Sequence, residues 1–188
     1  MNSNSTKNFS PTIVRFTDPS YLINQLEISP GSIAADFGCG AGFFSIPLAQ
    51  TVGKNGTVYS LDILPTALEA VESKAKTLGI VNIITKRANL ESEKGSGLPE
   101  NSVDWVIMKD ILFQNKNKEA ILKEAYRILK PGGKSLIVEW SDKNLSIGPQ
   151  ENLRISFEML IELIRQQKFS VEKAIDVGEF HYAVVVAK

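Results

Sequence analysis

The chain of 188 residues contains a single cysteine, Cys39, and a single histidine, His181. One cysteine cannot form an intrachain disulfide, so the sequence fits a reducing compartment and predicts a cytoplasmic protein. The side chains that most often bind zinc are therefore too few to form a cluster at ligand spacing, and we expect no metal site. No apolar run approaches the roughly 18 residues that a membrane-spanning helix needs.

The chain also lacks an excess of charge of either sign. Lysine and arginine total 21, and aspartate and glutamate total 21, so the formal net charge is zero. Electrostatic binding to nucleic acid or to an anionic membrane favours a basic chain, so neither is the favoured partner. The first ten residues are polar and contain no apolar signal segment. We predict a flexible N-terminal segment at 1–17 and a single domain at 18–188.

Hydrophobic periodicity and turn residues predict strands that alternate with helices. The expected strands are 31–35, 57–62, 82–87, 103–108, 135–140, 170–176 and 180–187, and the expected helices begin near 18, 43, 65, 118 and 153. The segment Lys130–Gly133 is a helix breaker and predicts a tight turn. Repeated strand–helix units imply a parallel sheet, whereas a strand pair joined by the short turn at 177–178 must be antiparallel. The fold class is therefore α/β, with a C-terminal antiparallel hairpin.

A glycine-rich loop, Asp36-Phe37-Gly38-Cys39-Gly40-Ala41-Gly42, joins the first of these strands to a helix. Three glycines let the backbone turn sharply and approach a ligand closely. Such loops form nucleotide-type pockets at the carboxyl ends of strands in α/β proteins. A dinucleotide fingerprint that begins at Gly38 would need glycine at position 43, where this chain has Phe43. The third glycine comes one residue early, at Gly42.

The pattern from Asp36 to Gly42 resembles motif I of the class I S-adenosylmethionine-dependent methyltransferases. Leu98-Pro99, before the expected strand 103–108, resembles a further signature of this family, and so does Lys130–Gly133, after the expected helix that begins near 118. The resemblance covers about 18–188. It implies a Rossmann-like sheet of seven strands with helices on both faces, S-adenosylmethionine as cofactor and S-adenosylhomocysteine as product. Within the family, the chain most resembles the small methyltransferases related to ubiquinone and menaquinone biosynthesis.

The resemblance also implies a set of cofactor contacts. Asp62 would accept hydrogen bonds from the ribose hydroxyls, although a carboxylate there would equally cap the next helix. Asn89 stands where the family usually has aspartate; its carbonyl oxygen would still accept from the adenine amine, or would serve an ordinary turn. The cofactor-binding positions implied in full are Asp36, Gly38, Cys39, Gly40, Gly42, Asp62, Ile63, Asn89, Leu90 and Lys109.

Three of these positions have distinct expected roles. Asp36 is implied to orient the methionine part of the cofactor near its sulfonium, or else to bond the amides of its own loop. Cys39 has no predicted partner base, so we expect a passive loop position. Lys109 is expected to contact the cofactor through its backbone and the stem of its side chain.

No catalytic residue is assigned from the sequence. Asp110 would act as a base toward the acceptor or cap the next turn, and His181 would act as a base or lie at a sheet edge. A sulfonium already carries an activated methyl group, so alignment contributes much of the catalysis. A base is needed only where the acceptor must lose a proton. Leu112 and Phe113 would line an apolar acceptor pocket or pack in the core.

The sequence therefore predicts an S-adenosylmethionine-dependent methyltransferase that acts on a small molecule. An RNA or protein methyltransferase, and a non-catalytic subunit that binds a partner protein, stay open as alternatives. We expect the acceptor site at the carboxyl ends of the fourth and fifth strands, bounded by 109–113, by 141–152 and by the residues before Tyr21. The oligomeric state is not predicted.

Overall fold

The computed structural model describes residues 18–143 and 147–188. Its elements, in chain order, are α1 (Pro19–Asn24), β1 (Ile33–Phe37), α2 (Ser45–Val52), β2 (Thr57–Asp62), α3 (Pro65–Thr77), β3 (Ile83–Arg87), β4 (Val103–Lys109), α4 (Lys118–Ile128), β5 (Leu129–Trp140), the 3-10 helix η1 (Glu151–Leu153), α5 (Phe157–Gln166), β6 (Ser170–Ile175) and β7 (His181–Ala187). The segment 1–17, predicted to be flexible, lies outside the described residues.

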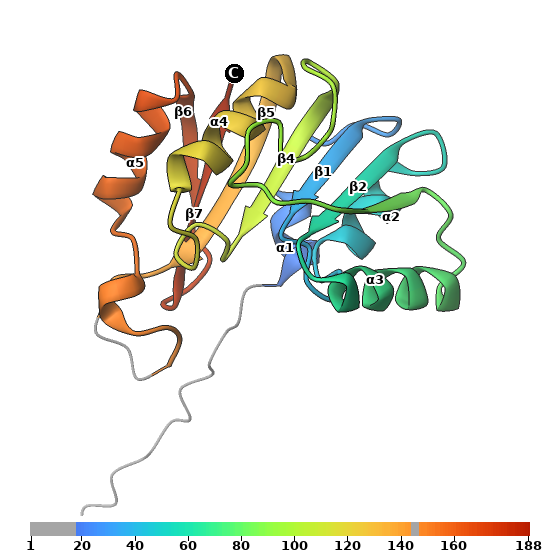
Figure 1. The fold of residues 1–188 in the computed structure, drawn as a ribbon, viewed down its shortest axis with the longest axis horizontal. Helices are drawn as coiled ribbons and strands as arrows, with labels where there is room; N and C mark the ends of the chain where they lie inside the picture. The colour runs from blue at the N-terminus through green and yellow to red at the C-terminus, as the bar shows by residue number, and fades with distance from the viewer. Residues whose placement is uncertain (1–17, 144–146) are drawn as a thin grey trace, which may run out of the picture.

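The strands form one sheet in the order β3-β2-β1-β4-β5-β7-β6 (Figure 1). The first five strands are parallel, and β7 is antiparallel to both β5 and β6. This arrangement confirms the predicted fold class. We call the edge where the carboxyl ends of β1–β5 meet the carboxyl edge. Because β7 runs in the opposite direction, its first residue, His181, pairs with Trp140 at this same edge.

Two apolar cores hold helices against the two faces of the sheet. On β4, Val106 and Met108 belong to the core shared with α4 and α5, whereas Trp105 and Ile107 belong to the core shared with α1 and α2. Figure 1 shows α4 in front of the strands and α5 beside β6. A strand buried on both faces reads as a continuous apolar run, which is what the sequence of β4 shows.

The segment Lys130–Gly133 differs from the prediction of a tight turn. As expected, α4 ends just before this segment, at Ile128. The segment itself, however, lies within β5, which begins at Leu129. Gly132 has a φ of +76°, and its N–H donates to the carbonyl of Lys188, 3.1 Å away. The N–H of Lys188 in turn donates to the carbonyl of Gly133. Pairing with the last residue of the chain therefore makes this segment an irregular part of the strand.

The helix α5 begins four residues later than predicted. Ser156 caps it, because its hydroxyl accepts a hydrogen bond of 3.1 Å from the N–H of Met159. The preceding residues form η1 and an extended link instead. A serine that satisfies a free helical N–H in this way fixes where the helix starts.

Candidate cofactor pocket and acceptor side

A hollow of about 380 Å³ lies at the carboxyl edge, beside the ends of β1, β2 and β3. The loop after β4 closes it on one side. The residues that line it are Gly38, Gly40, Asp62, Ile63, Leu64, Ala88, Asn89, Leu90, Glu91, Ile111, Gln114 and Asn115. We call this hollow the cofactor pocket. It contains six of the ten positions that the sequence implied for the cofactor.

The three glycines of the loop share a backbone conformation, but Gly40 and Gly42 serve different purposes. All have positive φ, with +69° at Gly38, +48° at Gly40 and +77° at Gly42, a region that side chains rarely adopt. A Cβ at Gly40 would meet no atom within 4 Å, so this backbone faces open space in the pocket. A Cβ at Gly42 would lie 3.1 Å from Val71 on α3, outside the pocket lining. Gly42 therefore permits helix packing, whereas Gly40 exposes backbone to a ligand.

Asp62 joins the glycine loop to the start of α3. One carboxylate oxygen accepts from the N–H of Gly40 and the other from the N–H of Leu64, each at 3.0 Å. The bond to Leu64 closes a turn just before α3, and this helix has no side-chain cap, so Asp62 does not have the capping role that the sequence left open. A carboxylate has about four acceptor positions, so two remain for hydroxyl groups of a ligand. The ribose-binding role that the sequence suggested fits this geometry.

The far end of the pocket has an apolar surface and an amide. Ile63 and Leu64 line this end and are 50% and 58% exposed, so their aliphatic side chains are available to a ligand. The Oδ1 of Asn89 accepts from the N–H of Glu91 at 3.2 Å, so the turn alternative is also present. A carbonyl oxygen accepts two hydrogen bonds, and Asn89 retains one of them for a ligand amine.

Asp36 lies beneath the pocket rather than in its lining. It is buried, and the hydroxyl of Ser45 donates to it at 2.6 Å, while Ser60 donates to Ser45 at 2.8 Å. Burial raises the pKa of Asp36 to about 6 against these hydrogen bonds, and the charge of Asp62 adds to the rise. The sequence analysis missed both serines, because serine in a strand or helix carries no distinctive signal.

Two further predicted cofactor positions, Cys39 and Lys109, also lie outside the pocket lining. Cys39 is buried against Leu68 and Val71. Its burial raises the pKa of the thiol, with Asp36 adding to the rise, so the sulfur stays protonated. This environment supports the expected passive role. Lys109 forms an ion pair with Asp110.

Asp110 and His181, separated by 71 residues, meet at the carboxyl edge. The Nε2 of His181 lies 3.2 Å from one carboxylate oxygen of Asp110 and 3.4 Å from the other. The ring of Trp140 lies 4.2 Å from the imidazole, centre to centre. The sequence left both residues with a catalytic and a structural role, and did not connect them.

Glu139 is a buried carboxyl group that the sequence analysis missed. Its Oε1 accepts from the N–H of Leu112 at 2.7 Å and so caps the turn after β4. Burial raises its pKa to about 8, with a contribution from the charge of Asp110. A charged residue within the apolar run 136–140 was the available signal. Leu112 is fully buried in the core, and Phe113 packs against that core, so both side chains have the packing role.

Arg154 organises the loop that was expected to border the acceptor. Its guanidinium donates to the carbonyls of Ser141, Lys143, Ile147 and Pro149 at 2.8–3.1 Å. Five N–H donors in one plane suit this use of arginine. Nothing in the sequence marked Arg154, because its partners are backbone atoms.

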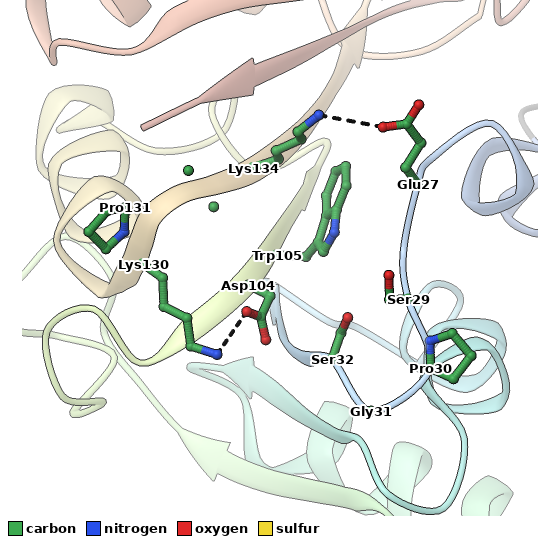
Figure 2. Close-up of a pocket in the computed structure, with 12 residues that line it drawn as sticks. Glu27, Ser29, Pro30, Gly31, Ser32, Asp104, Trp105, Lys130, Pro131 and Lys134 are labelled. Carbon is green, nitrogen blue, oxygen red and sulfur yellow. Dashed lines mark hydrogen bonds and ion pairs between the residues drawn. The ribbon is translucent and has the colours of Figure 1, made fainter.

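A larger hollow, of about 510 Å³, lies at the opposite edge of the sheet (Figure 2). Its charged groups are paired with one another. Asp104 accepts from the N–H of Ile33 at 2.8 Å and from Lys130 at 2.7 Å, and Lys134 pairs with Glu172 at 2.8 Å. Asp104 thus ties three strands together, which is a structural role.

The model of a family described as "Methyltransferase domain" matches residues 28–184. The chain belongs to this family. Together with the seven-stranded sheet, the match identifies a class I S-adenosylmethionine-dependent methyltransferase domain. S-adenosylmethionine is the methyl donor of this family.

Curated relatives are distant. A demethylmenaquinone methyltransferase from Anoxybacillus flavithermus is 32% identical over 123 residues, which cover 65% of this chain and 51% of that protein. A ubiquinone/menaquinone biosynthesis C-methyltransferase from Haemophilus ducreyi is 36% identical over 124 residues, covering 64% of this chain and 46% of that protein. The chain spans about half the length of the curated relatives it matches.

Solved structures share the fold. A SAM dependent methyltransferase from Aquifex aeolicus superposes with a TM-score of 0.84 at 23% identity, covering 95% of this chain and 93% of that one. The [4+2]-cyclase SpnF superposes with a TM-score of 0.78 at 15% identity, covering 90% and 79%. Since one neighbour is named for a cyclisation, fold alone does not fix the reaction.

Within residues 18–143 and 147–188, no helix is long and apolar enough to cross a bilayer. The same residues contain no group of three or more potential metal ligands.

Proposed function

We propose that this protein transfers the methyl group of S-adenosylmethionine to a small molecule. The observation that carries the proposal is the placement of Asp62, whose carboxylate bonds the backbone of Gly40 and borders the pocket with free acceptor positions. Gly40 in turn presents backbone without a side chain. A carboxylate beside an open glycine backbone suits a ribose, and it follows the family's motif at the expected spacing.

Each pocket group would then have one task. Asp62 binds the ribose hydroxyls, Ile63 and Leu64 pack against the adenine, and Asn89 accepts from its amine. The buried charge of Asp36 attracts the positive methionine part, although Ser45 already binds one of its oxygens. When bound, S-adenosylmethionine supplies the activated methyl group. The chain's own contribution is to orient the cofactor and the acceptor and to exclude water.

A small molecule is the acceptor that the observations support best. The relatives are named for quinone substrates, and the formal net charge of zero gives no electrostatic attraction to RNA. The proposal includes a cytoplasmic location, which the single cysteine suggested. An RNA or protein acceptor, and a non-catalytic subunit that needs a partner protein, are the alternatives.

The test uses the purified chain and S-adenosylmethionine with a labelled methyl group. The acceptor source is a protein-free and nucleic-acid-free small-molecule fraction of a bacterial extract. We expect label in a small organic product, and at least tenfold less label at subsaturating cofactor when the Asp62→Ala variant replaces the wild type at equal concentration. Label that appears only with the RNA or protein fraction would contradict the small-molecule acceptor. Transfer that requires an added protein would support the partner-dependent alternative.

A further inference from the structure

A chain of buried hydroxyl groups ends at Asp36, beneath the cofactor pocket. The hydroxyl of Ser60 donates to the hydroxyl of Ser45 at 2.8 Å, and Ser45 donates to the Oδ2 of Asp36 at 2.6 Å. Ser60 is also the residue of β2 that pairs with Asp36 of β1, and both serines are fully buried. Neither serine lines the pocket, so a ligand would sense them only through Asp36.

The hydrogen bonds of this chain run toward the carboxylate. A hydroxyl has one hydrogen and two acceptor positions, so Ser45 accepts from Ser60 and still has its own hydrogen for Asp36. A hydroxyl that accepts one hydrogen bond is polarised by it and donates the next one more strongly. Hydrogen bonds that are donated to the ionised form of an acid favour that form. Ser45 therefore acts on Asp36 directly, and Ser60 acts through Ser45.

The other surroundings of Asp36 oppose a negative charge. Burial raises the pKa of Asp36 to about 6, and the charge of Asp62 on β2 adds to the rise, while the hydroxyl and the backbone of Ser45 act against it. The helix α2 contains no charged residue, and the neighbour of Asp36 on β4 is Ile107. The thiol of Cys39 in the glycine loop stays protonated. The hydroxyl of Ser45 is therefore the group that most favours the carboxylate form.

We propose that Ser45 and Ser60 are positioning residues that keep Asp36 ionised at neutral pH, and that this charge makes the pocket favour S-adenosylmethionine over its product. The inference rests on the proposed methyl transfer. The sulfonium has a positive charge that the sulfur of S-adenosylhomocysteine lacks, so the cofactor gains more from a nearby carboxylate. With Asp36 protonated, the product would compete better with the cofactor for the pocket.

The first experiment reads the charge of Asp36 without any ligand. In protein labelled with 13C at the aspartate carboxyl groups, the signal that Asp36→Asn removes identifies Asp36, and its pH titration gives the pKa. We expect the wild type to titrate near pH 6. Loss of one hydrogen bond to a charged group corresponds to about one to two pH units, so Ser45→Ala should titrate that much higher. Ser60→Ala should move the same way by less than about one unit, because Ser60 acts only through Ser45.

The matched control is Ser135→Ala on β5. Ser135 is also fully buried, and its hydroxyl donates to the carbonyl of Val106 at 2.9 Å. This variant loses one buried hydrogen bond as well, but Asp36 should titrate as in the wild type. A wild-type titration of Asp36 in Ser45→Ala would overturn the proposal. If Ser45→Ala does not fold, Ser60→Ala decides by the same criterion.

The second experiment compares the affinities for S-adenosylmethionine and S-adenosylhomocysteine by calorimetry between pH 5 and pH 9. In the wild type, the ratio of the two affinities should shift toward the product as pH falls through about 6, and Asp36→Asn should lack this step. At pH 7 the preference for the cofactor should be about two- to tenfold weaker in Ser45→Ala than in the wild type, and the two proteins should agree by pH 9.

The outcomes of this comparison separate the inference from the function on which it rests. An equal ratio of affinities at pH 7 in the wild type and in folded Ser45→Ala would overturn the inference alone. Wild type that binds neither S-adenosylmethionine nor S-adenosylhomocysteine would instead overturn the proposed function.

Discussion

The carboxyl edge has two halves that are built differently. The half at β1, β2 and β3 presents backbone and single side chains to an open pocket, with Gly40 and Asp62 at its centre. The half at β4, β5 and β7 is closed, and its charged groups contact one another, as Asp110 and His181 do. In the open half the groups that a ligand would contact can be identified from the structure, whereas in the closed half the charged groups already contact one another. The comparison explains why the cofactor is easier to infer than the substrate.

The largest expected effect tests the open half. Asp62→Ala removes two acceptor positions for the ligand and also frees the N–H groups of Gly40 and Leu64. Hydrogen bonds to charged groups contribute about 1.5–3 kcal/mol each, so we expect affinity for S-adenosylhomocysteine to fall by at least tenfold. Titration calorimetry measures the change. The exposed Glu69→Ala on the same α3 is the control and should bind normally; near-unchanged affinity in Asp62→Ala would contradict the ribose assignment.

Asp36→Asn should have opposite effects on stability and on binding. The folded pKa of about 6 exceeds the ordinary value of 3.8, so the stabilising contribution is present below pH 3.8 and is lost as pH rises through 6. At pH 7.5 a neutral asparagine avoids that loss, and we expect the free energy of unfolding to rise by about 1–3 kcal/mol. Affinity should fall, more for S-adenosylmethionine than for its uncharged-sulfur product. Chemical denaturation and calorimetry report the two effects, and a destabilised variant with normal affinity would contradict them.

Arg154→Ala should loosen the closed half without touching the open one. The variant loses hydrogen bonds to four carbonyls between Ser141 and Pro149. We expect trypsin to cut after Lys143 at least tenfold faster, while affinity for S-adenosylhomocysteine changes less than twofold. The exposed Arg165→Ala on α5 is the control. Equal cleavage rates in both variants would show that Arg154 does not hold this loop.

The smallest effect concerns Glu139→Gln. The folded pKa of about 8 lies above the ordinary 4.5, so the stabilising contribution is lost as pH rises through 8. Lys109, the last residue of β4, and Asp110, which follows it, are the charges that act on this carboxyl. The wild type should lose about 1 kcal/mol relative to Glu139→Gln between pH 7 and pH 9. Glutamine keeps an acceptor for the N–H of Leu112, so the two proteins should match only below about pH 4.5, where Glu139 is protonated in both the folded and the unfolded state. Parallel stability curves across this range would contradict the buried charge.

The two halves of the carboxyl edge also differ in how much of them the sequence could predict. The glycine loop, Asp62 and Asn89 follow successive strands at family spacing, so their meeting at one edge followed from the strand–helix order. The pairing of Asp110 with His181 did not, because it depends on the antiparallel direction and register of β7 across 71 residues. The expected turn at Lys130–Gly133 was wrong because its backbone pairs with Lys188, which no local pattern reveals. The described hydrogen bonds of Arg154 go to backbone carbonyls, which no sequence pattern reveals.

The most direct measurement of the central claim compares two alanine variants of the glycine loop by titration with S-adenosylhomocysteine. Gly40→Ala and Gly42→Ala share the cost of a side chain at positive φ, but only Gly40 borders the pocket. If the cofactor lies against the open backbone of this loop, Gly40→Ala loses at least tenfold in affinity. Gly42→Ala then stays within about twofold of the wild type and loses stability instead. Equal affinity in the two variants would contradict the placement of the cofactor.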